Sequence, residues 1–265
     1  MTTSISSWRF WSLSFCAWIL VGFLFLPLVI LVPASLTDQT YLSLPQEHIS
    51  FQHYKAVYTN SRWLSAIGQT FVIAFCSAVL ATVIGGLAAI ACWRHPRSVW
   101  SWIVGGLTLC PLMIPPVVSA VGFYRVWADL GWLDSYIGVI FAFTIKTLPY
   151  TFTPIAASLS LFDNRLEQAA RNLGSNQMSA IWHVVVPAAR PGIISGLLFA
   201  FVYVWDEIVI LLFITNRQIR LLSRLIWEGL RDNVHPSIAV VSASLTLLTI
   251  VVVLIVLQIQ KGRSA

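Results

Sequence analysis

Three ionisable side chains lie deep inside apolar stretches, where they could line a pathway through the membrane or form its gate. Asp206 and Glu207 follow an apolar run that begins near residue 192, roughly 22 Å along a helix that rises 1.5 Å per residue. A charge in hydrocarbon costs about 2.5–3.5 kcal/mol on insertion scales, so each should face a pore, water or a partner. Because neighbouring residues of a helix point in different directions, we expect one of these two carboxylates to be structural unless the helix is irregular there.

Lys146 is the third charge, flanked by Thr144 and Thr147. It lies too far inside its apolar stretch for the ammonium group to reach the membrane surface fully. It can neutralise Asp206 or Glu207, meet an anionic or zwitterionic solute, or serve a structural role. Lys146, Asp206 and Glu207 are therefore the candidate pathway or gate residues.

The chain lacks the sequence patterns of an enzyme. An ATP-binding phosphate loop ends in GK[ST], and the only Lys followed by Ser or Thr is Lys146, which Ile145 precedes. No two His residues are spaced i,i+4 as in HExxH, and the four Cys residues form no CxxC pair. We expect no catalytic residue, no metal site and no bound cofactor on this chain, so any ATP and Mg²⁺ must bind another subunit.

The composition indicates a protein embedded in a lipid bilayer. AVILMFWYC residues make up 58% of the 265 residues and charged residues only 10%, against about 25% in soluble domains. This excludes a soluble enzyme. The net charge of +6 comes from Lys and Arg scattered between apolar runs, so the sequence does not favour nucleic-acid binding.

Apolar windows predict an all-α membrane protein with six transmembrane helices, because each crossing needs about 20 apolar residues. Pro111, Pro115 and Pro116 should break the third span, and Pro149 and Pro154 the fourth. The six predicted spans cover residues 12–34, 66–91, 99–122, 136–157, 192–214 and 236–258.

Lys and Arg are divided almost evenly between the two sides of such a bundle. Those on the side of the termini lie in short segments, while most loop carboxylates lie opposite. We therefore expect both termini and the connection 158–191 in the cytoplasm.

The segment from Leu161 to Ile193, here called the 161–193 hairpin, predicts two short helices. Asp163 or Asn164 can cap the first helix and Gly174 can end it; Ser175 can cap the second, which Pro187 should stop.

The first helix of the hairpin has a narrow face of small and apolar residues, Leu166, Ala169, Ala170 and Leu173. Glu167 and Arg171 lie one turn apart and can pair with each other or with a partner protein. On the residues alone, a docking surface and a plain interfacial hairpin fit equally well.

The run EQAARNLG, followed by VVVP and ARPG, resembles the EAA motif of ATP-binding-cassette (ABC) importer permeases. Gln168 stands where the family often has Ala, and Val185 stands at the usual Ile. The positions that match the motif are Glu167, Ala169, Ala170, Gly174 and Pro187.

Two further stretches resemble the spermidine/putrescine group of these permeases, namely WDEIVILLFIT at 205–215 and LIWEGLRDNVHPSIAVVS at 225–242. The resemblance implies a type I ABC importer permease fold with cytoplasmic coupling helices. It divides the chain into a first helix and periplasmic loop (1–63), a permease core (64–258) and a cytoplasmic tail (259–265).

The resemblance also implies partners and a location. The partners are a second permease, ABC ATPase subunits that bind ATP and Mg²⁺, and a periplasmic substrate-binding protein, all at a bacterial inner membrane. The solute should be small and polar, either polyamine-like or an opine or aminophosphonate.

Two alternatives remain on the sequence. A self-contained secondary transporter or channel could use the Asp, Glu and Lys inside the membrane, although no internal repeat is evident. A purely structural membrane protein would leave both these charges and the 161–193 hairpin without a use.

Overall fold

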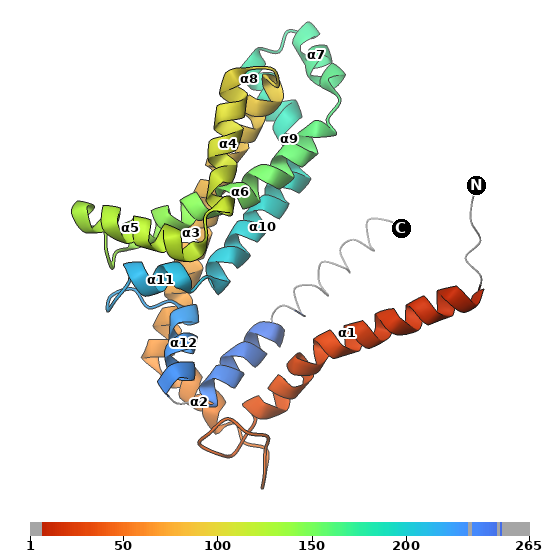
Figure 1. Ribbon diagram of the computed structural model, residues 1–265. Helices are drawn as coiled ribbons and strands as arrows, with labels where there is room; N and C mark the ends of the chain where they lie inside the picture. The colour runs from red at the N-terminus through yellow and green to blue at the C-terminus, as the bar shows by residue number, and fades with distance from the viewer. Residues whose placement is uncertain (1–6, 233–234, 248–249, 251–265) are drawn as a thin grey trace. The chain divides into compact units, whose positions relative to one another are not determined.

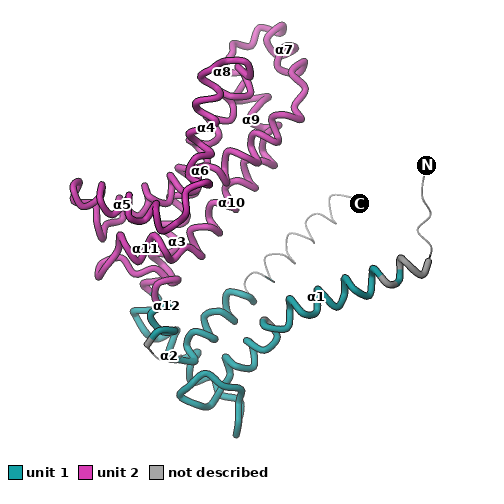
Figure 2. The backbone as a smooth tube through the Cα atoms, in the orientation of Figure 1, with its two compact units in different colours: residues 1–64, 226–265 teal, residues 65–225 magenta. Residues whose placement is uncertain are grey.

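The computed structural model describes residues 7–232, 235–247 and 250, and this part of the chain is helical without β-strands. The helices fall into two compact units, residues 65–225 and residues 1–64 with 226–265 (Figure 2). Each unit is described by itself.

Unit 65–225 contains the second to the fifth predicted spans (Figure 1). Its principal helices are α3 (Ser61–Arg94, which begins in the other unit), α4 (Val99–Met113), α5 (Pro116–Leu130), α6 (Tyr136–Ser160), α10 (Arg190–Asp206) and α11 (Val209–Ile214). Helices α6 and α10 pack along each other, and two glycines of α10 make this possible. A Cβ atom at Gly192 would lie 2.4 Å from the Pro154 carbonyl oxygen, and one at Gly196 would lie 3.0 Å from the Thr151 Cα.

The third predicted span is not one straight helix. Helix α4 ends at Met113 and α5 starts at Pro116, and the two are bent by 107°. Consecutive prolines cause the break, because Pro115 and Pro116 have no N–H to donate and disfavour helical geometry in the residue before each. Ile114 is accordingly extended, at φ −87° and ψ 121°. Helix α5 then continues beyond the predicted end at 122.

The predicted break of the fourth span is wrong, since α6 remains one helix through Pro149 and Pro154. Single prolines are tolerated in membrane helices whose neighbours hold both halves in place. Helix α6 is buried along much of its length, with Phe143, Ile155 and Leu159 almost fully enclosed.

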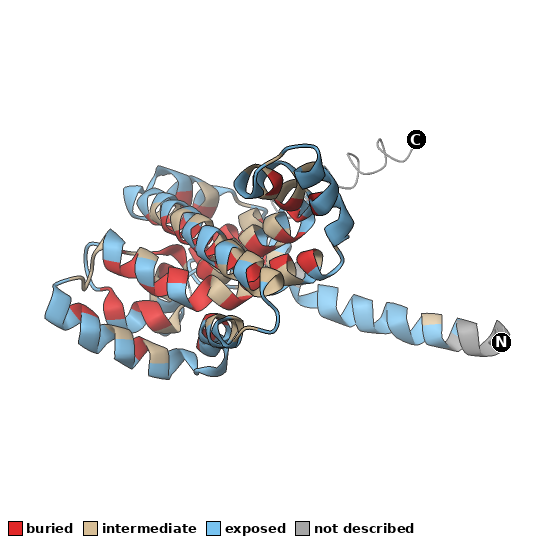
Figure 3. Cartoon of the chain, turned by 90° about the horizontal axis from the view of Figure 1, so that it is seen from above, coloured by how far each residue is buried: buried red, intermediate tan, exposed pale blue. Residues whose placement is uncertain are grey.

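The buried residues of this unit lie where its helices meet, and exposed residues cover their outer faces (Figure 3). One cluster joins α3, α5, α6 and α11 around Ile73, Phe143 and Leu211. A second cluster joins α3, α6 and the 161–193 hairpin around Ile155, Leu159 and Val185. The hairpin is therefore packed into the same unit as the spans.

Three helical segments of the described residues, Leu13–Ser35, Ser61–Arg94 and Tyr136–Ser160, are long and apolar enough to cross a membrane. The number rises to five if each of two bent helix pairs forms one span. The predicted fifth span is interrupted between α10 and α11. Of the predicted sixth span, 236–258, the structure describes the helix Ser237–Leu247 and residue 250, and the predicted tail 259–265 lies outside the described residues.

The other unit contains α1 (Ser7–Ser35), the short helix α2 (Gln52–Thr59), the end of α12 (Leu222–Asp232) and the helix Ser237–Leu247. Helix α2 lies inside the polar connection that follows α1. In that connection the Asp38 carboxylate accepts the Gln46 amide at 2.9 Å, a hydrogen bond that lowers the pKa of Asp38. The hydroxyl of Tyr58, in α2, donates to the Ser244 hydroxyl at 2.9 Å. This hydrogen bond ties α2 to the helix Ser237–Leu247.

Candidate functional site

The first helix of the 161–193 hairpin is α7 (Asn164–Asn172), and its ends are set by local hydrogen bonds and geometry. The Asp163 carboxylate accepts the Arg165 amide at 2.9 Å, as expected of an N-cap. Gly174 follows the helix with φ +92°, a left-handed conformation that glycine adopts without strain. Both features confirm the predicted limits of this helix.

The second helix differs from the prediction in two ways. Its N-cap is Asn176, whose side-chain oxygen accepts the Ser179 amide at 2.8 Å, so Ser175 is one residue away from the actual cap. Pro187 does not stop it. Helix α8 (Gln177–Ala180) continues through the π-turn Ile181–Val185 into α9 (Val186–Ala188), where Pro187 lies in the first turn. The helix changes there from π-helical to α-helical hydrogen bonding, and Pro187 lies at the start of the α-helical part.

Glu167 is buried and forms an ion pair with Arg94, the last residue of α3. Their side chains are only 10% and 16% exposed. Arg171, the predicted partner one turn away, forms no ion pair among the described residues. The pair with Arg94 fixes α7 to the end of a core span.

The predicted small face of α7 is largely uncovered. Leu166 is 55% exposed and Leu173 is 89% exposed, while Ala169 between them is also exposed. Ala170 is half-buried. Three of its four residues therefore present side chains that nothing in the described part of the chain covers. Figure 1 shows α7 at one end of unit 65–225.

Glu207 is the structural member of the carboxylate pair. Helix α10 ends at Asp206, and Glu207 Oε1 accepts the amides of Val209 at 2.7 Å and Ile210 at 3.2 Å. Its other oxygen accepts the Tyr203 hydroxyl at 2.9 Å. Glu207 thus holds the first amides of α11, at the break that follows Asp206.

Asp206 is exposed and has no hydrogen bond or ion pair within the described residues. It borders a cavity of about 240 Å³ together with Tyr203 and Val209. The Tyr203 ring lies beside that of Tyr150, with 5.0 Å between ring centroids. A free carboxylate beside aromatic rings can attract a cation.

Lys146 is 4% exposed and is held by the broken span. Its ammonium group donates to the carbonyls of Pro111 at 2.8 Å and Ile114 at 3.0 Å, and to the Ser119 hydroxyl at 3.2 Å. It forms no ion pair with Asp206 or Glu207, all three being in the described part of the chain. Lys146 satisfies carbonyl groups that the break between α4 and α5 leaves without helical donors.

Asp134 is a further residue of consequence that the sequence analysis did not identify. It has φ +51°, and its carboxylate accepts the amides of residues 216–219 at 2.8–3.1 Å. Burial raises its pKa, but the four amide hydrogen bonds outweigh burial and lower the pKa to about 2. Asp134 therefore clamps the turn before α6 to the turn after α11.

Comparison with known proteins finds a matching family and relatives that are permease proteins of transport systems. Residues 81–262 match the family described as "Binding-protein-dependent transport system inner membrane component". The spermidine/putrescine transport system permease protein PotC of Haemophilus influenzae is 27% identical over 247 residues, covering 93% of this chain and 95% of PotC. The putrescine transport system permease protein PotI of Escherichia coli is 27% identical over 228 residues, 83% of this chain and 81% of PotI.

Solved structures confirm the predicted fold. A bacterial ABC transporter involved in import of the acidic polysaccharide alginate superposes with a TM-score of 0.64 at 16% identity, covering 97% of this chain and 99% of that one. An amino acid ABC transporter superposes with a TM-score of 0.56 at 16% identity, covering 82% and 100%.

Proposed function

Because this chain belongs to the family of inner membrane components of binding-protein-dependent transport systems and is a permease subunit of an importer, we propose that its solute is a small cation of the polyamine type. Asp206 carries the proposal, since it is the carboxylate of the pair that is not engaged in the fold. Lys146 does not oppose it, because its charge is directed to backbone carbonyls. The names of the PotC and PotI relatives agree with this solute class.

In this proposal Asp206 receives one ammonium group of the solute at the break between α10 and α11, with the rings of Tyr203 and Tyr150 close by. Glu207 keeps the break in shape by capping α11. The wider permease core, 64–258, positions both residues, and a second permease subunit supplies the other wall of the pore.

ATP hydrolysis takes place on partner ATPase subunits, which hold ATP and Mg²⁺, and this chain transmits the motion. The 161–193 hairpin docks into the ATPase through Leu166, Ala169 and Leu173, whose exposure supports such a contact. This assignment places the hairpin and both termini in the cytoplasm. A substrate-binding protein delivers the solute from the periplasmic side.

The solute proposal is tested by uptake of labelled spermidine in cells that produce the complete importer. Asp206→Asn should lower uptake at least tenfold, with normal insertion and normal recovery of the ATPase. Asp129→Asn is the matched control, because Asp129 is a 65% exposed carboxylate on α5 and its loss should leave uptake unchanged. Unchanged uptake in Asp206→Asn, or import of an aminophosphonate instead of spermidine, would refute the proposal.

The partner proposal is tested by extracting the tagged chain from its own host in mild detergent and identifying co-purifying proteins by mass spectrometry. Recovery of a Walker-motif ATPase and a second permease supports it. Recovery of this chain alone, under conditions that preserve a known importer, would favour a self-contained transporter.

A further inference from the structure

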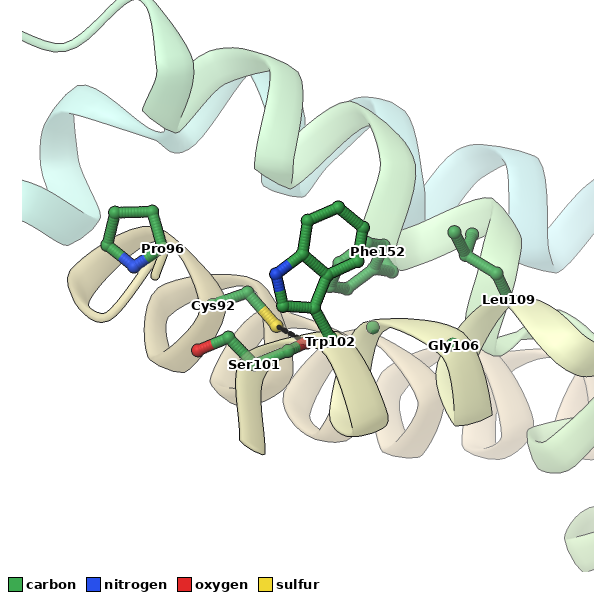
Figure 4. Close-up of a pocket in the computed structure, with 8 residues that line it drawn as sticks. Cys92, Pro96, Ser101, Trp102, Gly106, Leu109 and Phe152 are labelled. Carbon is green, nitrogen blue, oxygen red and sulfur yellow. Dashed lines mark hydrogen bonds between the residues drawn. The ribbon is translucent and has the colours of Figure 1, made fainter. Parts of the chain in front are cut away.

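An apolar cavity of about 420 Å³ lies where the end of α3 turns into α4 and faces α6 (Figure 4). Its walls include Cys92, Pro96, Ser101, Trp102, Leu109 and Phe152. The thiol of Cys92 donates to the Ser101 carbonyl at 3.3 Å, so this polar group already has a partner. What the cavity offers a ligand is therefore hydrocarbon surface.

A cationic residue follows one residue of the cavity wall in the sequence. Arg97 follows Pro96 directly in the turn between α3 and α4, and it is exposed without a hydrogen bond or ion pair in the described part of the chain. Arg94, the last residue of α3 before this turn, is paired with Glu167. Arg97 is thus the cation of this turn that can bind an external anion.

The tryptophans at the start of α4 indicate that the cavity opens near a membrane surface. Trp100 is 74% exposed and Trp102 is 75% exposed, and exposed tryptophans in a membrane protein gather at the level of the lipid headgroups. Trp102 is itself part of the cavity wall (Figure 4). An apolar hollow with a basic residue at that level suits an amphiphile with a negative head.

We propose that this cavity binds an anionic phospholipid of the bilayer, with one acyl chain between Trp102 and Phe152 and the phosphate group at Arg97. Charge complementarity selects a lipid over an apolar helix of another subunit, because such a helix would leave Arg97 without a counter-charge. The site is distinct from the solute pathway at Asp206. Arg94, which pairs with Glu167, stands in the sequence between Cys92 and Pro96 of the cavity wall.

The test is native mass spectrometry of the complete purified importer, titrated with phosphatidylglycerol or phosphatidylcholine. Phosphatidylglycerol should be retained preferentially, and Arg97→Gln should lower its occupancy at least fivefold. Arg125→Gln removes an exposed charge from α5 and is the matched control, with no change expected. Equal retention of the two lipids, or equal occupancy in Arg97→Gln, would overturn the proposal.

A second variant tests the acyl-chain cavity. A Cβ atom on Gly105 would lie 3.8 Å from Cys92 Sγ and 3.9 Å from Phe152 Cζ, so Gly105→Leu should fill the cavity without a backbone clash. It should also displace phosphatidylglycerol, whereas Gly122→Leu, where an added Cβ meets nothing within 4 Å, should not.

Alkylation of Cys92 by N-ethylmaleimide, in a variant without the other cysteines, gives an independent reading. It should slow at least threefold in nanodiscs that contain phosphatidylglycerol. Alkylation unaffected by lipid, or a photo-crosslinker at position 102 that captures the second permease in place of lipid, would refute the site. Both readouts are independent of the transported solute, so they separate this proposal from the one on cargo.

Discussion

Glu167→Gln should detach α7 from the core, although Gln keeps the length and shape of the Glu side chain. A detached helix of nine residues is too short to stay folded in water, so its amides become open to exchange. The substitution leaves the Arg94 guanidinium without its counter-charge, in a place where the two side chains are 16% and 10% exposed. Removing one partner of a fully buried pair costs about 3–5 kcal/mol. Because some water reaches both groups, we expect about 2–3 kcal/mol here, which shifts the equilibrium towards detached α7 by about 30- to 150-fold.

Hydrogen–deuterium exchange of the purified importer measures this shift directly. Amides of residues 164–172 should exchange faster in Glu167→Gln by the same factor, and uptake should fall while ATP hydrolysis continues. The charge-swap variant, which carries both Arg94→Glu and Glu167→Arg, should restore slow exchange. Asp129→Asn, which breaks the exposed pair with Arg125, should alter exchange little. If the amides of residues 164–172 exchange at the wild-type rate in Glu167→Gln, the view that this pair holds α7 is refuted.

Three further outcomes follow from contacts in unit 65–225. Asp134→Asn should destabilise the chain by about 1–2 kcal/mol at pH 7 in thermal unfolding. Because the pKa of Asp134 is lowered from 3.8 to about 2, its contribution is fully present above pH 3.8 and is lost as the pH falls through about 2, where variant and wild type should unfold alike. Gly192→Ala places a Cβ 2.4 Å from a backbone oxygen and should cost about 1–3 kcal/mol. Gly68→Ala, inside α3 with open space around it, should instead stabilise the chain by about 0.5–1 kcal/mol in the same unfolding assay. Lys146→Met should cost about 1–3 kcal/mol by leaving buried carbonyls without donors, and competition assays should show unchanged solute preference.

Features set by neighbouring residues could be predicted from the sequence. The Asp163 cap depends on an amide two residues away, and the turn at Gly174 depends on that residue's own φ. The α1, α3 and α6 spans followed from the lengths of their apolar runs, because the bilayer fixes the length of a crossing helix. The break after Ile114 also followed, since two consecutive prolines are a local cause.

Features that need distant partners could not be predicted. Arg94 and Glu167 are separated by 73 positions, and nothing in either local sequence selects the other. The sequence allows Lys146 to neutralise a carboxylate, to meet an anionic or zwitterionic solute, or to serve a structural role, and its local residues do not decide among the three. The carbonyls it binds become available only once α4 has ended. Conversely, Pro149 and Pro154 did not break α6, because its neighbours enclose it.

The Asp134 clamp also constrains how the protein is made. Its carboxylate is synthesised 82–85 residues before the four amides that it binds. During synthesis this carboxylate must remain hydrated until α6, the 161–193 hairpin, α10 and α11 have all been made. The bonds can form only if both turns emerge on the same face of the bilayer. The clamp therefore acts as a check on topology, since a chain with one span inserted in the wrong direction cannot close it.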